Sequence, residues 1–395
     1  MTVNISKPAL NVREKLAELD KPTGVAGEAM LRAETPQEQF NLIGAGRRNL
    51  IINGDMKVAQ RGTSATVSNG SNEGYSTVDR FFLNFNSNAG GAASFSQSTD
   101  APNGLANSAK IQCSTTNTSY TGTQNVELQH RLEAQDLQQL AYGTSEAREV
   151  TLSWYMKTVN FVGPISVTFE TRDGTSEYYT KSYMPTTSWQ RYTLTLPPST
   201  SATINNDNGQ GMFVKFVLAG SSSGTYSKST DSTSWSTTRA DYVDDVGNIL
   251  SSTSNEFYIT GVQLELGKVA TPFEHRSYGE ELALCQRYFF KMDFPQTTTF
   301  GPAHHQTTNT MRCVVQAPQP MRTTPSINAT GQPTWFVYWA GGSSNGTFNQ
   351  GDKFSVVGSS LDNDRITLQA TITGLYGLVG GLFGYLGDFD FDAEL

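Results

Sequence analysis

One five-residue string in this 395-residue chain matches a catalytic motif by residue type and spacing. Gly220-Ser221-Ser222-Ser223-Gly224 has the G-x-S-x-G pattern, whose central serine is the nucleophile of an α/β-hydrolase. That motif requires a strand before it and a helix after it, inside an α/β sheet. A strand-like run does precede the string, but a loop rich in serine and threonine follows it. The pattern therefore does not predict a hydrolase.

Metal-ligating side chains are present, but none has the spacing of a known metal motif. The four histidines lack a His-Glu-x-x-His pattern, and adjacent histidines on a strand point to opposite faces. Three chains around an axis would offer another way to build a histidine site, and a polar surface pair is the simpler interpretation. Three aspartates share a loop without EF-hand spacing. We predict no metal and no other cofactor; the residues weighed are His130, His275, His304, His305, Asp241, Asp244 and Asp245.

Composition and charge exclude several functional classes. The formal net charge is −8 and lysines and arginines form no run, so a nucleic-acid-binding surface is not expected. No apolar stretch has the length of a membrane span or a signal peptide. Cys113, Cys285 and Cys313 are too few and too far apart for a disulfide framework, which fits folding in a reducing cytoplasm. Carboxylates are too scattered to nominate a glycosidase pair, so we expect a protein that is not an enzyme.

Aromatic side chains are the remaining candidates for binding. Three tyrosines lie on or beside a polar hairpin, SEYYTKSY, and one tryptophan lies in a long polar insertion, residues 220–254. Two further tryptophans crowd one short strand, TWFVYWAGG, where one face must meet solvent, ligand or another subunit. The alternative for each is burial in the core, where large aromatics are more common. The candidate carbohydrate-binding residues are Tyr178, Tyr179, Tyr183, Trp235, Trp335 and Trp339.

Short strands separated by turn residues would position these side chains. About eight strand-like runs lie between residues 49 and 266, which is typical of a jelly roll or sandwich. Trp154 and Trp189 alternate with polar neighbours and are expected in the core. The runs are NLIINGDMKVAQRG, STVDRFFLNFN, EVTLSWYMKTV, GPISVTFETR, SEYYTKSYMP, WQRYTLTLP, GMFVKFVLAG and FYITGVQLELG.

The stretch 257–289 marks a junction between two β-rich regions. Residues 258–266 alternate as a half-buried strand does, and Gly267 ends the run. The sequence SYGE, with Ser277 and Glu280, is a capping box that predicts a helix start. One face of this helix, with Leu282 and Cys285 between Tyr278 and Phe289, is expected to dock on an apolar surface.

The string GVQLELGKVATPFEHRSYGEELALCQRYF resembles a segment of tailed-bacteriophage fibre and tail-associated proteins, where it closes a jelly roll of the carbohydrate-binding-module type. The resemblance implies that Asn49–Ala59 lies near Phe257–Leu266, because the first and last strands of such domains pair. Members of that fold family often hold a structural calcium at this place, and the matching positions here are Asn53, Asp55 and Glu265. Lys57 stands where an acidic ligand is usual, so no calcium site is predicted.

The first 47 residues differ from the rest and read as two short helices. A capping box at Thr35–Glu38 starts the second of them. Neither is long enough to be stable alone, so each needs a partner surface, either its own domain or another protein. The phrase TPQEQFNLIGAGRRNLIINGD resembles the start of phage fibre domains, which favours attachment to the virion. Val12, Leu16, Leu19 and Phe40 are the candidate attachment residues.

Together these patterns predict an all-β virion protein with four parts. They are a helical attachment segment (1–47), a carbohydrate-binding-module-like jelly roll (48–275), a linking helix (276–290) and a C-terminal β-sandwich (291–395). Such fibres resemble homotrimers, and glycine-rich last strands suit a subunit interface. The expected function is adhesion to host polysaccharide. The alternatives are a capsid or tail decoration fibre without glycan affinity and a polysaccharide-degrading tailspike-type enzyme.

Overall fold

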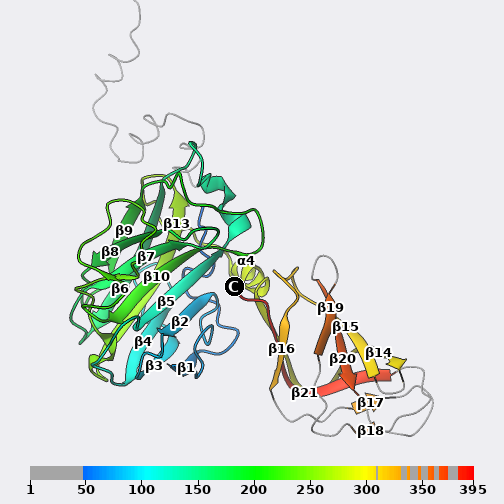
Figure 1. Ribbon diagram of the computed structural model, residues 1–395. Coiled ribbons are helices and arrows are strands. Elements are labelled where there is room, and N and C mark those ends of the chain that lie inside the picture. The colour runs from blue at the N-terminus through cyan, green and yellow to red at the C-terminus, as the bar shows by residue number, and fades with distance from the viewer. Residues whose placement is uncertain are drawn as a thin grey trace, which may run out of the picture. The chain divides into compact units, whose positions relative to one another are not determined.

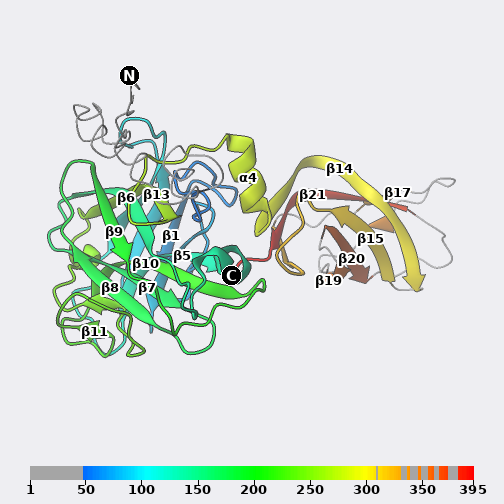
Figure 2. The same cartoon turned by 90° about the horizontal axis from the view of Figure 1, so that it is seen from above.

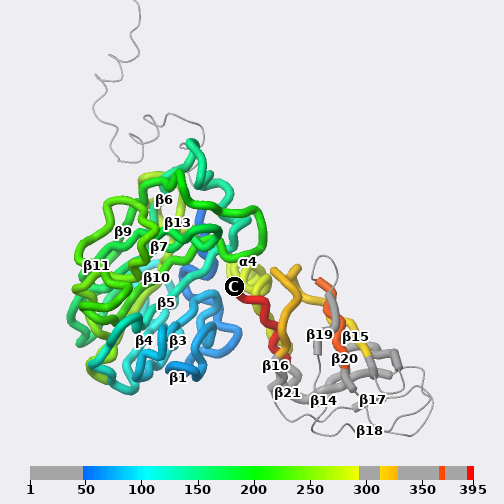
Figure 3. Tube along the Cα trace, in the orientation of Figure 1, coloured from blue at the N-terminus to red at the C-terminus, as the bar shows by residue number. Residues whose placement is uncertain are grey.

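The computed structural model describes residues 48–307, 310–330, 336–338, 346–347, 355–359, 364–371 and 381–395. The course of this part of the chain can be followed by colour in Figure 3. The predicted attachment residues Val12, Leu16, Leu19 and Phe40 lie outside the described residues, and so do Trp335 and Trp339. Their proposed roles stay predictions.

Two antiparallel sheets pack face to face and form a β-sandwich (Figures 1 and 2). The six-stranded sheet has the order β1-β3-β4-β13-β6-β9 and the five-stranded sheet the order β2-β5-β10-β7-β8. The first contains β1 (Ser64–Ser68), β3 (Ala92–Ser98), β4 (Ser108–Thr115), β13 (Glu256–Leu266), β6 (Val150–Val159) and β9 (Gln190–Leu196). The second contains β2 (Phe81–Asn86), β5 (Asn125–Glu133), β10 (Gln210–Gly220), β7 (Ile165–Thr171) and β8 (Tyr178–Tyr183). The predicted all-β class is confirmed.

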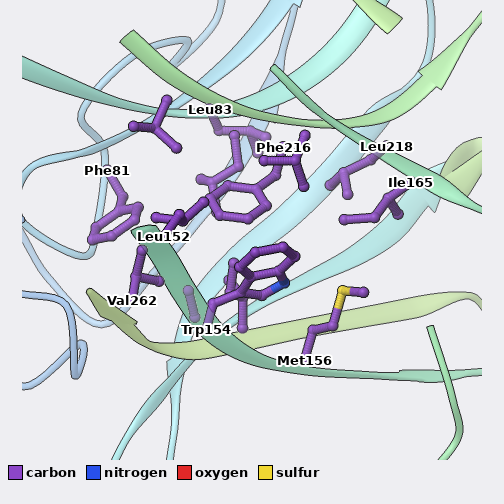
Figure 4. Close-up of a cluster of buried hydrophobic side chains, with 14 of the residues drawn as sticks. Phe81, Leu83, Leu152, Trp154, Met156, Ile165, Phe216, Leu218 and Val262 are labelled. Carbon is purple, nitrogen blue, oxygen red and sulfur yellow. The ribbon is translucent and has the colours of Figure 1, made fainter. Parts of the chain in front are cut away.

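Period-two alternation fills the space between the sheets. In β6, Leu152, Trp154 and Met156 point inward, and they meet Phe216 and Leu218 of β10 (Figure 4). Trp154 has no exposed surface, as predicted for the core. Burial of each such side chain contributes about 1.5–3 kcal/mol, so the sandwich has a core large enough to fold on.

Four of the eleven sandwich strands were not among the predicted runs, namely β1, β3, β4 and β5. β1, β3 and β4 are rich in serine and threonine, which weakens the contrast between their buried and exposed positions. β5 has a clearer signal, because Val126 and Leu128 enter the core while Glu127, Gln129 and Arg131 alternate with them.

The predicted strand over residues 49–59 is wrong, although its predicted neighbour is right. The segment is irregular, and Asn53 has a left-handed φ of 60°. It nevertheless lies along β13: the Leu50 amide donates to the Leu264 carbonyl and the Val262 amide to the Gly54 carbonyl, both at 2.9 Å. The segment is irregular because side-chain amides replace part of its backbone pairing. Asn49 Oδ1, for example, accepts from the Leu264 amide at 3.0 Å.

Gly54 is required by close approach to β13. A Cβ at this position would lie 2.1 Å from the Val262 carbonyl oxygen, well inside van der Waals contact. The glycine in the string NLIINGD therefore lets the first segment reach the last strand of the sandwich.

Asp79 predicts a pH-dependent stability. It is buried behind this first segment, and burial raises the pKa of its carboxyl to about 6 despite Arg61 and hydrogen bonds from Gln60. The unfolded carboxyl has a pKa of about 4, so between pH 4 and 6 the folded state holds the extra proton. Stability should therefore fall as pH rises through this window. Over this pH range we expect the free energy of unfolding of the wild type to fall by about 2–3 kcal/mol more than that of the Asp79→Asn variant.

Urea unfolding at several pH values between 4 and 7.5 measures this difference. The exposed Glu146→Gln variant is the control and should follow the wild type. Parallel curves for Asp79→Asn and wild type would contradict the assignment.

The predicted helix start at Ser277 is confirmed. Helix α4 (Tyr278–Gln286) opens with a complete capping box between Ser277 and Glu280. Its predicted apolar face is correct only in part: Cys285 is buried and Leu282 packs beside it, but Tyr278 is 58% exposed. Phe289 is not on the helix, because α4 ends at Gln286 and Phe289 begins β14.

The strands after α4 form one eight-stranded antiparallel sheet in the described residues. Its path is β18-β17-β21-β14-β15-β20-β19, and β16 pairs with β21. The predicted second sandwich stays a prediction. The strands are β14 (Phe289–Thr307), β15 (Thr310–Gln316), β16 (Ser326–Thr330), β17 (Phe336–Tyr338), β18 (Gly346–Thr347), β19 (Ser355–Ser359), β20 (Arg365–Thr371) and β21 (Gly381–Asp392). The remaining elements are the 3-10 helices η1 (Ala134–Leu140) and η2 (Ile249–Ser251) and the short strands β11 (Ser227–Lys228) and β12 (Tyr242–Val243).

Candidate functional site

The face of the five-stranded sheet that points away from the core carries a concentrated set of polar and charged side chains. We call it the outer face. Because side chains alternate along each strand, it is defined by the neighbours of the core residues. It consists of Phe82, Asn84, Glu127, Gln129, Arg131, Phe213, Lys215, Val217, Ser166, Thr168, Glu170, Tyr178, Thr180 and Ser182.

The long polar insertion covers one side of the outer face. Thr168 Oγ1 donates to the Asp241 carbonyl and Thr180 Oγ1 to the Ala240 carbonyl, both at 2.6 Å. The Val243 amide donates to Ser166 Oγ at 2.9 Å. The insertion is therefore packed on β7 and β8, and its Asp241 also reaches Lys215 of β10. The part of the outer face around Phe82 and Arg131 is only half-buried and is left as the candidate for ligand contact.

Lys215 is the centre of a buried ion network on this face. Its Nζ lies 2.6 Å from Glu170, 3.0 Å from Asp241 and 3.9 Å from Glu127, and its side chain is only 3% exposed. Burial lowers the pKa of Lys215, but the three carboxylates more than offset this, so the net shift is upward. The ammonium therefore stays charged and holds the carboxylates together.

Two carboxylates of this network have pKa values shifted in opposite directions. Burial raises the pKa of Glu127, although Lys215 opposes it. Burial acts the same way on Glu170, but Lys215 and Arg172 outweigh it and its pKa is lowered. Both side chains are at most 2% exposed and are held by Lys215. We therefore assign Glu127 and Glu170 a structural role in the outer face.

Beside the ion network, arginines and aromatic rings alternate across the strands. Arg131 lies directly opposite Phe213 in the register of β5 and β10. The Arg131 Cζ atom is 3.9 Å from the ring centre of Phe82 and 5.0 Å from that of Phe213. Arg172 Cζ is 4.9 Å from the same Phe213 ring, and Tyr75 packs edge-on against Phe82. We call Tyr75, Phe82, Arg131, Phe213 and Arg172 the arginine–aromatic row.

The guanidinium groups of this row retain hydrogen-bonding capacity. A guanidinium has five N–H donors. Arg131 donates from Nε to Gln129 at 3.0 Å and from Nη1 to the Leu395 carbonyl at 2.5 Å, and Arg172 donates from Nη1 to Glu170. Arg131 is half-buried and the Arg172 side chain is 37% exposed, so donors on both remain for a ligand. Cation–π contact with the rings fixes the guanidinium planes in advance.

The structure describes four of the six aromatic candidates, and none of the four presents an open ring. Tyr178 and Tyr179 are 7% and 5% exposed, so the exposed rings expected there are absent. Tyr178 donates to Glu170 at 3.1 Å, and Tyr179 packs against Trp235. Tyr183 is half-buried against the core residue Trp154, and both it and Tyr179 point inward.

The two remaining described tryptophans also differ from expectation in their surroundings. Trp235 is half-buried and donates from Nε1 to the Pro197 carbonyl at 2.8 Å. Trp189 was expected in the core, but it is half-buried on the outer side of the six-stranded sheet. There its Nε1 donates to Asp100 at 3.0 Å and its ring meets Tyr258 edge-on. The polar partner of the indole explains why it stays at the surface.

Lys57 occupies the surroundings that the resemblance implies for calcium. Its Nζ lies 2.7 Å from Asp55 and donates to the Arg276 carbonyl at 2.7 Å. Glu265 is instead bound to Thr271, whose amide and hydroxyl donate to its two oxygens. Across residues 48–307 and the later described segments, no three His, Cys, Asp or Glu side chains are grouped as metal ligands. The helices of the same residues include none that is long and apolar enough to span a bilayer.

The residues of the arginine–aromatic row were not singled out from the sequence. One usable signal is the run of outward polar residues in β5, which ends with Arg131. Another is the single lysine, Lys215, within the apolar strand GMFVKFVLAG, because a charge in such a strand requires buried partners. Which partners these are depends on strand order, and strand order is set by contacts distant in sequence.

Comparison with known proteins finds no matching family model and no matching curated protein. Solved structures with similar arrangements include the family 11 carbohydrate-binding module of a Clostridium thermocellum cellulase, with 9% identity, 56% of this chain and 96% of that one covered, and a TM-score of 0.27. A putative sugar-binding protein from Bacteroides thetaiotaomicron has 12% identity, coverage of 56% and 100%, and a TM-score of 0.30. The enzymatically active domain of bacteriophage CBA120 tailspike protein 4 has 11% identity, coverage of 51% and 21%, and a TM-score of 0.28, so the match spans about a fifth of that chain.

Proposed function

We propose that this chain is a structural protein of a tailed-phage virion that adheres to an acidic polysaccharide of the host surface through the arginine–aromatic row. The observation that carries the binding site is the pair of guanidiniums, Arg131 and Arg172, whose Cζ atoms lie 5.0 and 4.9 Å from the centre of the Phe213 ring. Guanidinium forks match carboxylates in shape and charge. The sequence resemblance described above supports the virion role.

The acidic class of sugar follows from the chemistry of the row. A neutral sugar is usually held by stacking on an open aromatic face together with hydrogen bonds to its hydroxyls. Here Phe213 is 6% exposed, and guanidiniums lie near both it and Phe82, so the rings support the cations and do not form an open platform. Uronate carboxylates are sugar groups that such cations recognise.

Binding to matched polymers tests this proposal. We expect the protein to bind at least one of polygalacturonate, alginate and hyaluronate, and to bind the carboxyl-reduced form of that polymer more weakly. Loss of a charged hydrogen bond typically costs about 1.5–3 kcal/mol, so Arg172→Gln should weaken binding about tenfold or more. The control is Arg148→Gln, which changes an exposed arginine elsewhere on the surface.

Two results would count against the site. One is equal affinity for the intact and carboxyl-reduced polymers, and the other is an Arg172→Gln variant that binds like the wild type. A protein that binds none of the polymers but is found in virions would favour the decoration-fibre alternative. New reducing ends released from the bound polymer would instead favour the tailspike-type enzyme.

The proposed homotrimer would strengthen weak binding by avidity, because several copies of the row would contact one polymer. Light scattering of the full-length protein measures the number of chains directly. A mass near three chains supports the fibre, and a monomer at all concentrations contradicts it.

A further inference from the structure

The last described residues of the chain lie against the sandwich near α4 (Figure 1). We call Asp392–Leu395 the tail segment. The Ala393 amide donates to the Tyr288 carbonyl at 2.8 Å. The side chain of Leu395 is buried in an apolar cluster with Ile52, Val58, Cys285 and Tyr288. The tail segment therefore has both a backbone and an apolar anchor.

Both acidic side chains of the tail segment pair with arginines of the sandwich. Asp392 Oδ2 lies 3.0 Å from Arg61 Nη2, and Glu394 Oε1 lies 3.3 Å from Arg61 Nη1. The other oxygen of Glu394 pairs with Arg80, whose side chain is only 1% exposed. Because Arg80 is buried, it requires this carboxylate for charge compensation.

The same arginines connect the tail segment to the arginine–aromatic row. Arg61, Arg80 and Arg131 surround the ring of Tyr75, with Cζ atoms 5.6, 5.7 and 5.8 Å from its centre. Arg80 Nη2 donates to the backbone carbonyl of Arg131 at 2.6 Å. Arg131 Nη1 in turn donates to the Leu395 carbonyl at 2.5 Å. Arg131 is thus held through both its backbone and its guanidinium.

We propose that the tail segment is a positioning element of the polysaccharide site, which holds Arg131 in the orientation that binds a sugar carboxylate. This inference rests on the proposed function. Glu394 and Leu395 need not touch the ligand, because they act through Arg80 and Arg131. The C-terminal β region would then control the preference of the outer face for acidic sugars.

Glu394→Gln and Asp392→Asn test this role in the full-length protein. The probe is whichever of polygalacturonate, alginate or hyaluronate the wild type binds, together with its carboxyl-reduced form. For Glu394→Gln we expect about tenfold weaker binding of the acidic polymer and less than about twofold change for the reduced one. Asp392→Asn should give a smaller loss in the same direction, because its side chain is 41% exposed and pairs only with Arg61 among the residues described.

The ratio of the two affinities distinguishes positioning from general damage. Binding is measured at a temperature at which circular dichroism shows each variant folded, and Asp392→Asn serves if Glu394→Gln does not fold. The control is Glu149→Gln, which removes the pair between the half-buried Glu149 and the exposed Lys268. An unchanged ratio in the folded tail variants overturns this inference alone. A wild type that binds no acidic polymer overturns the proposed function, and this inference with it.

Discussion

Replacement of Lys215 by methionine is expected to lower the free energy of unfolding by about 3–5 kcal/mol at pH 7, which is the usual effect of breaking a buried ion pair from one side. Methionine fits the space of the lysine stem but leaves Glu127, Glu170 and Asp241 without the ammonium that lies among them. Urea unfolding followed by circular dichroism measures the loss.

The same variant should regain stability as the pH is lowered from 7 to 5. Without Lys215, the buried carboxylates are stabilised by protonation, which the folded state then favours more than the unfolded state does. The control is Lys181→Met, because Lys181 and its partner Asp231 are 27% and 43% exposed and lie 3.6 Å apart. That change should cost no more than about 1 kcal/mol. Equal unfolding midpoints for Lys215→Met and the wild type would show that the network contributes nothing to stability.

Asn53→Ala is expected to lower the free energy of unfolding by about 3–5 kcal/mol. The change removes three buried hydrogen bonds, and it places alanine at a positive φ, which alanine tolerates less well than asparagine does. Asn53 Nδ2 donates to the carbonyls of Val58 and Asp79, both at 2.8 Å, and its Oδ1 accepts from the Val58 amide at 3.0 Å. The Val58 amide and the Asp79 carbonyl would lose this buried partner, whereas the Val58 carbonyl still accepts from the Asp79 amide at 3.1 Å. Chemical unfolding at constant pH measures the difference.

Asn72→Ala is the matched control for this effect. Asn72 also has a positive φ, 52°, but it is exposed, and its side chain donates to the Thr66 carbonyl at 3.0 Å. The Asn72→Ala substitution should lower the free energy of unfolding by about 1 kcal/mol, mainly because alanine is unfavourable at a positive φ. Asn53→Gly loses the same three hydrogen bonds but has no conformational cost at positive φ. It should therefore be only slightly more stable than Asn53→Ala. Similar losses at positions 53 and 72 would show that the buried hydrogen bonds of Asn53 are not important.

The parts of the fold that the sequence predicts are those with local signals. The strand signal of β13 and the capping box of α4 are contained within a few residues, and both elements are present in the structure. The predicted alternation of β13 is wrong in detail, because a bulge between Thr260 and Gln263 places both Ile259 and Val262 in the core. The segment 49–59 was mispredicted as a strand because its apolar residues resemble one. Its conformation depends instead on Asn49 and Asn53, which bond to partners far along the chain or to turns that sequence alone does not show.

The candidate site was harder to predict because its residues come together only through sheet order. Arg131 and Phe213 belong to the neighbouring strands β5 and β10, and Arg172 directly follows β7, which pairs with β10. The sequence places tyrosines in β8, but their faces depend on register, and a shift of one residue exchanges the core side for the solvent side. The register places Tyr179 on the core side of β8. Tyr178 is on the outer face, where the insertion covers it through the Tyr178–Ser236 bridge.

The irregular first segment is also bonded to the residues that follow β13, and these bonds, which we call the clamp, determine how the molecule would bear a mechanical load. The Asn49 amide donates to Glu274 at 2.6 Å, Arg276 donates to the carbonyls of Asn49 and Ile51, and the Asn53 amide donates to Glu281 at 2.5 Å. Tension applied between residue 49 and the strands after α4 would pass through this short bridge. The sandwich strands between these two points, with the outer face they form, would not carry this force. A tether pulled at both of these points would therefore break the clamp before it deformed the surface that holds the polymer.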